Sequence, residues 1–177
     1  MEIIPASPEP RSEAIKGRRA QIDPAFAHWF AGFVDGEGSF TVRVCEPREH
    51  KGNYTDIDVE FSIILRDDDA AILQEIVDNL GLNARITWYP AMTNHQGVRS
   101  NPRAKLSVRR VKNCLRIIEI LDKYPLRAKK RNDYKIWREI VLLLNDLPRG
   151  NKWHGPADKS HILELVTRLR EVRKYAN

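Results

Sequence analysis

Residues 29–40, WFAGFVDGEGSF, constrain the fold most, because within them helical spacing gives way to strict alternation. Gly32 and Gly36 are four residues apart, so they share one face of a helix, with Ala31 alongside. A glycine inside a helix costs about 1 kcal/mol relative to alanine, and close approach of a second helix can compensate for that cost. From Ser39 onward, polar and apolar residues alternate as in a half-buried strand. The stretch therefore predicts a helix that runs directly into a strand.

Two acids, Asp35 and Glu37, follow where this helix is expected to end, at Gly36 or Gly38. Negative charge at the C-terminus of a helix is unfavourable because it opposes the helix macrodipole. This placement suggests a counter-cation, and a bound metal ion is one candidate. The alternative is an ordinary helix–turn–strand junction with surface carboxylates, and the spacing alone favours that alternative.

Length and cysteine content limit the class of protein. A chain of 177 residues is large enough for one domain with a real core. No apolar run approaches the length of a membrane span, and the N-terminus lacks the apolar segment of a signal peptide. Cys45 and Cys114 form neither a disulfide framework nor a metal-ligand spacing. We therefore expect an intracellular protein in a reducing compartment, either a bacterial cytoplasm or an organelle.

The distribution of charge says more than its total. The net charge of +6 is moderate, but residues 99–138 hold 14 Lys or Arg against three Asp or Glu. So concentrated a basic segment favours a polyanionic partner, such as a nucleic acid. The alternative is a solvated basic helix face.

Turn residues and periodicity place the other elements. Asp23 and Pro24 form a strong helix start, as N-cap and first helical residue. Asp67–Asp69 are expected to cap a helix that ends at Gly81. The other expected helices span residues 24–35, 112–123, 128–147 and 160–175, and the expected strands span residues 39–45, 55–65, 84–89 and 103–110. Residues 1–22 are predicted to be a flexible or partly helical tail, and residues 23–177 a single domain.

The second strand shows the clearest alternation, with apolar residues on one face and mostly acidic residues on the other. Four such strands covered on one face by helices make an α+β fold. The open polar face is a candidate nucleic-acid groove, since two-stranded ribbons fit the DNA major groove. Trp29, Trp88 and Trp137 are predicted to lie in the core rather than to stack on bases.

The stretch from Phe30 to Gly38, FAGFVDGEG, resembles the signature of the LAGLIDADG homing endonucleases. Members of that family follow the signature with ββαββα and carry a basic patch after a Pro-Leu pair, which here is Pro125-Leu126 before RAKKR. The similarity covers about residues 24–147. The chain holds one copy of the signature, and single-motif members act as homodimers. The resemblance therefore implies a homodimer that packs through Ala31, Gly32, Asp35 and Gly36.

The resemblance also implies a fold and an activity. The implied fold is αββαββα, with a four-stranded antiparallel, DNA-binding saddle sheet backed by helices. The implied activity is site-specific cleavage of both strands of a long, pseudo-palindromic double-stranded DNA target by metal-dependent phosphodiester hydrolysis, leaving short 3′ overhangs. The break would favour the spread of a host intron. The alternative is a catalytically inactive DNA-binding protein of this fold, or an intron-splicing maturase. No membrane partner and no small-molecule substrate are expected.

By the same resemblance, Glu37 is the catalytic metal ligand and the carbonyl of Gly36 a further ligand. Oxygen ligands suit Mg²⁺, and Mn²⁺ is expected to substitute for it. Lys129 aligns with the active-site lysine of the family, although the adjacent cations Lys130 and Arg131 are alternatives. The chain departs from the family at Leu65, where members often have a water-organising Gln. Arg66 or one of Asp67–Asp69 is a candidate replacement.

The residues expected to contact DNA are those on the open face of the sheet and those in the basic cluster. Acids facing DNA would repel phosphates, so these either accept from cytosine N4 or pair across strands with Arg43, and we expect a mixture of both. The predicted DNA-binding residues are Ser39, Thr41, Arg43, Asp56, Asp58, Glu60, Ser62, Arg66, Arg85, Thr87, Tyr89, Lys105, Ser107, Arg109, Lys130 and Arg131.

Overall fold

The computed structural model describes residues 22–45, 56–93, 95–147 and 156–173. The predicted tail lies outside these residues except for Ile22. Residues 46–55, 94, 148–155 and 174–177 also lie outside them.

Helix α1 (Pro24–Glu37) starts as predicted but runs two residues further. The Asp23 carboxylate accepts hydrogen bonds from the amides of Ala25 and Phe26, each at 3.3 Å, which closes the first turn. Gly38 ends the helix in an extended conformation, and its amide donates to the carbonyl of Val34. Glycine is needed there for space, because a Cβ would lie 2.6 Å from Cγ1 of Val34. Because the helix ends at Gly38, Glu37 is its last residue.

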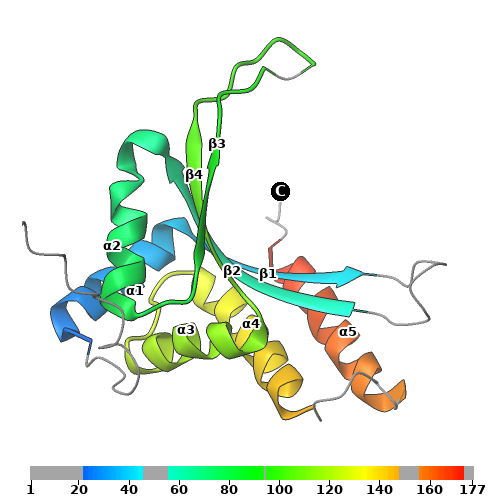
Figure 1. Ribbon diagram of the computed structural model, residues 1–177. Helices are drawn as coiled ribbons and strands as arrows, with labels where there is room; N and C mark the ends of the chain where they lie inside the picture. Colours follow the sequence, from blue (N-terminus) through cyan, green and yellow to red (C-terminus); the bar gives the residue numbers. More distant parts are fainter. Residues whose placement is uncertain (1–21, 46–55, 94, 148–155, 174–177) are drawn as a thin grey trace, which may run out of the picture.

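Four strands form one antiparallel sheet in the order β1-β2-β4-β3 (Figure 1). The strands are β1 (Gly38–Cys45), β2 (Asp56–Arg66), β3 (Arg85–Tyr89) and β4 (Arg103–Arg109). Glu60 lies opposite Thr41 on one side and Arg109 on the other, so the polar residues of neighbouring strands share one face. The predicted alternation of β2 is confirmed, and so is the α+β class.

The helices gather on the other side of the sheet, while the β3–β4 hairpin extends beyond them (Figure 1). The helices after α1 are α2 (Ala71–Leu80), α3 (Val111–Lys123), α4 (Lys130–Asp146) and α5 (Pro156–Val172). The order α1-β1-β2-α2-β3-β4-α3 is the predicted αββαββα. Among the helices of the described residues, none combines the length and the apolar character needed to cross a bilayer.

The start of α2 differs from the prediction. Asp67–Asp69 form a 3-10 turn, and the helix begins after Ala70 without a side-chain cap. The Asp68 carboxylate is instead held by Arg66, with its closest contact at 2.7 Å. The end of α2 follows the prediction, since Gly81 adopts the left-handed conformation with φ 59°.

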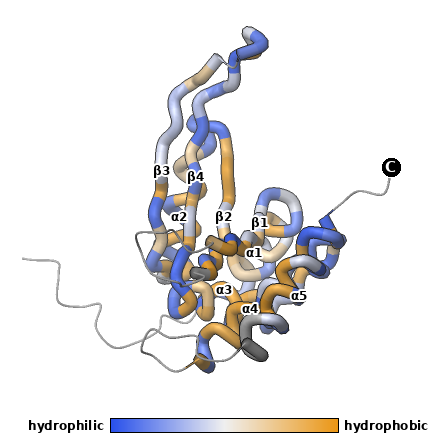
Figure 2. The backbone as a smooth tube through the Cα atoms, turned by 90° about the vertical axis from the view of Figure 1, so that its right-hand side faces the viewer, coloured by the Kyte–Doolittle hydropathy of each residue, from blue (hydrophilic) through white to orange (hydrophobic). Residues whose placement is uncertain are grey.

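The core lies between the apolar face of the sheet and the helices, as the hydrophobic segments of β2, α3, α4 and α5 show (Figure 2). The ring of Phe40 contacts that of Trp137 at 5.2 Å between centroids, and Trp137 is fully buried as predicted. The prediction is wrong for Trp29 and Trp88, which are 39% and 62% exposed. Trp29 lies on the outer side of α1, stacked on Phe33, and Trp88 lies on the edge strand β3.

Candidate active site and nucleic-acid interface

The end of α1 is tied to the segment that precedes α4. Oδ2 of Asp35 accepts hydrogen bonds from the amides of Arg127 at 2.7 Å and Ala128 at 3.1 Å. Its other oxygen, Oδ1, is buried and has no hydrogen-bond partner among the described residues. Asp35, predicted at a dimer interface, thus has a role within the chain, which is to bring the basic cluster beside the motif.

The side chain that reaches the motif from this cluster is Lys130. Its Nζ donates to the carbonyl oxygen of Gly36 at 2.7 Å. Burial lowers the pKa of Lys130 below 10.5, while the charges of Glu37, Asp133 and Asp35 act in the opposite direction. Lys129 occupies the N-cap position of α4 and is exposed. Of the adjacent cations considered from the sequence, the geometry favours Lys130 over Lys129.

Glu37 is exposed at the last position of α1, directly before the strand that opens the sheet. Its carboxylate and the Gly36 carbonyl are oxygen atoms at this end of the helix. Within the part of the chain that the structure describes, no three His, Cys, Asp or Glu side chains form a group suited to a metal ion. Since Mg²⁺ prefers six oxygen ligands, a cation here would take the remainder from water, from DNA or from a second chain.

The glycines of the motif differ in why they are glycines. Gly38 is required by the packing of its own chain, whereas a Cβ added to Gly32 or Gly36 would meet no atom of the described residues within 4 Å. Both are exposed on α1. Ala31, also predicted at the interface, is only 6% exposed and belongs to the core of its own chain. It therefore has little surface left for a partner.

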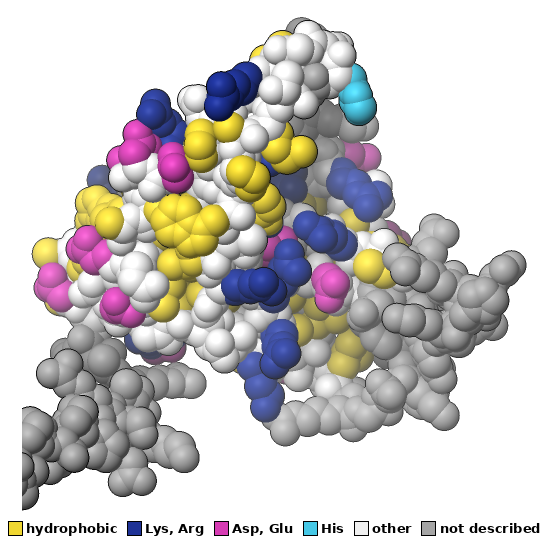
Figure 3. Space-filling view, turned by 45° about the horizontal axis from the view of Figure 1, so that its top comes forward, with side chains coloured by type: hydrophobic (Ala, Val, Ile, Leu, Met, Phe, Trp, Pro, Cys, Tyr) yellow, Lys and Arg dark blue, Asp and Glu magenta, His cyan; other side chains and the backbone are white. Residues whose placement is uncertain are grey.

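The predicted DNA-contacting strand residues with described side chains all lie on the face of the sheet that points away from the helices. Figure 3 shows Lys and Arg side chains gathered in a band on this side of the molecule. The centre of the face is more enclosed than predicted, because Glu60, Ser62 and Ser107 are only 5%, 4% and 8% exposed. The side chain of Asp56 lies outside the described residues.

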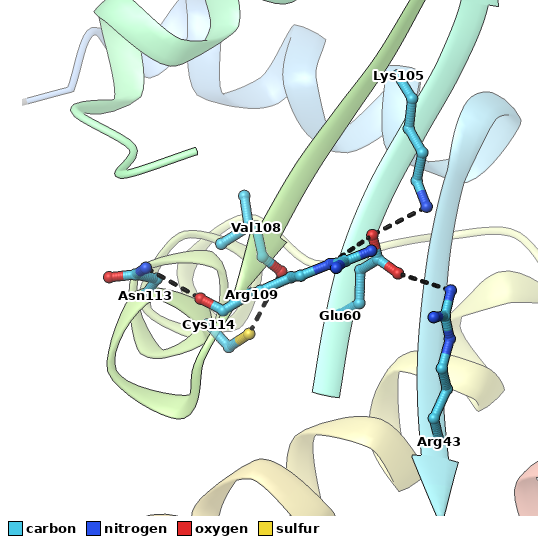
Figure 4. A network of polar contacts seen from close by, with 7 residues as sticks. All are labelled: Arg43, Glu60, Lys105, Val108, Arg109, Asn113 and Cys114. Atoms are coloured by element: carbon cyan, nitrogen blue, oxygen red, sulfur yellow. Dashed lines mark hydrogen bonds and ion pairs between the residues drawn. The ribbon is translucent and has the colours of Figure 1, made fainter. Parts of the chain in front are cut away.

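Glu60 is the centre of a charge cluster that joins three strands (Figure 4). Its Oε1 contacts Nζ of Lys105 at 2.9 Å and Nε of Arg109 at 3.2 Å, and its Oε2 lies 3.6 Å from a terminal nitrogen of Arg43. Burial favours the neutral acid, but hydrogen bonds from Lys105, Ser107 and Arg109 outweigh it and hold the pKa of Glu60 below 4.5. For Glu60, of the two alternatives considered from the sequence, the structure shows the cross-strand ion pair.

Two neighbouring positions complete the open face. Leu65 packs against the core, and its apolar side chain cannot organise water as the Gln of the family does. Arg66, a candidate replacement, is paired with Asp68. Ile64 lies on the open face and is 46% exposed. Arg103, opposite both Arg66 and Tyr89, places its guanidinium 5.4 Å from the centroid of the Tyr89 ring. The prediction missed Ile64 and Arg103, although the alternation of their strands was a usable signal.

Comparison with known proteins shows the class to which this fold belongs. The family model described as LAGLIDADG endonuclease matches residues 30–141. The chain is 28% identical over 122 residues to the probable intron-encoded endonuclease Cox1-I1b of Schizosaccharomyces pombe. It is 30% identical over 128 residues to an uncharacterized 50.9 kDa protein in ND4 intron 1 of Podospora anserina. These matches cover 69% and 71% of this chain but only 28% and 25% of those relatives, about a quarter of their length.

Solved structures of homing endonucleases share the fold of this chain. The homing endonuclease I-TnaI is 27% identical, with a TM-score of 0.60 over 82% of this chain and 94% of that chain. The archaeal intron-encoded homing endonuclease I-Vdi141I, in complex with DNA, is 21% identical and shares the fold, with a TM-score of 0.68 over 86% and 87% of the two chains. The chain therefore belongs to the LAGLIDADG homing endonuclease family.

Proposed function

We propose that this chain is a site-specific homing endonuclease that cleaves both strands of a long, pseudo-palindromic DNA target. The cleavage is metal-dependent phosphodiester hydrolysis that leaves short 3′ overhangs and promotes intron mobility. The observation that carries the proposal is the end of α1, where the Glu37 carboxylate and the Gly36 carbonyl lie beside Lys130. Family membership and a fold shared with I-Vdi141I in its DNA complex support it. Residues 23–177 would act as a single endonuclease domain.

A divalent cation, Mg²⁺ with Mn²⁺ as a substitute, fits the oxygen atoms at the end of α1. Glu37 and the Gly36 carbonyl would hold it, because both are hard ligands of the type that Mg²⁺ takes. That carbonyl already accepts a hydrogen bond from the ammonium of Lys130 at 2.7 Å, so its oxygen faces a cationic group. When bound, such an ion supplies Lewis-acid polarisation of a phosphate oxygen and a more acidic water.

Lys130 would act as the catalytic cation of the chain in place of the predicted Lys129. Its ammonium, held at the motif, is placed to stabilise negative charge that develops on a phosphate. Lys129 and Arg131 are exposed next to it and would contact phosphates of the target. The open face of the sheet would lie in the major groove, with Arg43, Arg85 and Arg109 among its exposed cations.

A homodimer would supply the second active site that two scissile bonds require. Gly32 and Gly36 support it, because they lack a packing reason within the chain and would let a second α1 approach closely. Gly32→Leu should abolish dimerisation while leaving a folded monomer, since no atom of the described part of the chain lies within 4 Å of a Cβ there. Light scattering checks the mass of the variant, and a dimer of normal mass would contradict this interface.

The test of the activity is cleavage of a DNA library with randomised sites in the presence of Mg²⁺ or Mn²⁺, with Glu37→Gln alongside. The proposal expects wild type to cut a defined, roughly symmetric site and the variant to bind that site without cutting it. If both proteins bind the same DNA and neither cuts, the chain is a binding protein or a maturase of this fold. Salt-sensitive binding does not distinguish these functions, since both would show it.

A further inference from the structure

Glu60 is an unexpected residue for a surface that binds a polyanion. It stands at the middle of the open face and is 5% exposed, yet its pKa is held low, so it carries a negative charge at neutral pH. An acid there lowers the affinity of the face for any phosphate backbone. Its presence therefore needs a reason other than affinity.

The three cations around Glu60 are not equivalent. Lys105 is 14% exposed and lies closest, at 2.9 Å, so it acts mainly to neutralise the carboxylate. The side chains of Arg43 and Arg109 are 58% and 60% exposed. Figure 4 shows both side chains reaching toward the carboxylate, Arg43 from β1 and Arg109 from β4.

Arg109 is held at both ends. Its Nε contacts Glu60, a contact that does not use the two terminal nitrogens of the guanidinium. Its backbone carbonyl accepts a hydrogen bond from the side-chain amide of Asn113 at 2.9 Å (Figure 4). A guanidinium fixed through Nε presents its terminal pair of donors in a defined direction. That pair is the fork that binds O6 and N7 of guanine in the major groove.

We propose that Glu60 is a positioning residue that orients Arg109 to read guanine in the major groove. The inference rests on the proposed binding of DNA by this face and concerns base preference rather than cleavage. Without the carboxylate, Arg109 would be free to turn toward phosphates, which carry no sequence information. Glu60 thus lowers the affinity for all DNA and in return makes the face selective.

The test is binding selection from randomised DNA by the full-length chain without divalent metal, comparing base preferences position by position. Arg109→Ala first identifies the positions that Arg109 reads. Glu60→Gln should then lose about tenfold of the guanine preference at those same positions, the scale of one bidentate contact. Its affinity for non-specific DNA should rise, because one negative charge has been removed.

Glu75→Gln is the matched control, since it makes the same chemical change at an exposed position of α2, outside the sheet. It should leave the guanine preference unaltered. Thermal unfolding checks that each variant is folded. Glu60→Asp repeats the test with the negative charge kept, but with a side chain one methylene shorter, so that the carboxylate lies further from Arg109. Retained guanine preference in the folded Glu60 variants, or no guanine preference that depends on Arg109, overturns the inference. A wild-type chain without any site preference would instead contradict the proposed function.

Discussion

Two charge clusters of this molecule have similar composition but opposite exposure. At the centre of the sheet, Glu60 is buried and surrounded by three cations of its own chain. At the end of α1, Glu37 is exposed, and the nearby Lys130 donates to a backbone carbonyl. The Glu60 carboxylate is already paired with cations of its own chain. The Glu37 carboxylate is exposed, so a cation from solution can reach it. The difference separates a group that fixes structure from one available for chemistry.

The largest effect is expected for Glu37→Gln. The change removes the negative charge that would hold a metal ion, so cleavage should fall by about a thousandfold or more, the upper range for loss of one charge-stabilising group. DNA binding should change little, and the melting temperature should stay near that of wild type because the side chain is exposed. Single-turnover cleavage and binding measured on one target check this. Loss of binding in parallel with cleavage would show that this cluster too is structural.

The choice of lysine comes next. Lys130→Met should lower cleavage by about a hundredfold, because it removes the ammonium placed at the motif. Lys129→Met, the matched change one residue earlier, should lower cleavage much less and chiefly weaken binding. Measuring both constants at a fixed salt concentration separates the two effects. Equal or reversed effects on cleavage would return the catalytic role to Lys129.

Glu60→Gln should destabilise the fold by about 2 kcal/mol, less than for a fully buried pair because two of its cations are largely exposed. Since folding lowers the pKa of Glu60 below 4.5, its contribution is present above that pH and is lost as pH falls through the folded-state value. The difference between wild type and variant in urea unfolding should therefore be large at pH 7 and shrink as the pH falls below 4.5. Asp122, whose pKa is also lowered, is common to both proteins and cancels. A difference that does not vary with pH would contradict the ionic role.

The smallest effect is expected for Asp35→Asn. The amide oxygen can still accept from the backbone of residues 127 and 128, while the amide nitrogen takes the buried position of Oδ1. We expect a loss of about 1 kcal/mol, mainly from the lost charge assistance. Denaturant unfolding measures this loss. Glu75→Gln is the control, because it makes the same acid-to-amide change at an exposed position outside the cluster. A loss of several kcal/mol would mean that the α1–α4 junction matters more to folding than its two hydrogen bonds indicate.

Local signals carried much of the fold. The Asp23-Pro24 start, the left-handed Gly81 and the alternation of β2 are each set by a few adjacent residues, and each was predictable. The α2 start was not, because the Asp68 carboxylate is held by Arg66 rather than capping the helix. The exposure of Trp29 and Trp88 was not predictable either. The local pattern of a helix or strand does not show which part of it the other helices cover.

The sequence by itself determined the family, the αββαββα order and the acids at the end of α1, because these depend on a local motif and on periodicity. Only the tertiary structure decided that Lys130 reaches Gly36, and that Glu60 is enclosed by Lys105, Arg109 and Arg43. These contacts join residues up to 94 positions apart. They depend on the phase of α4 and on the β1-β2-β4 order, which no local pattern encodes.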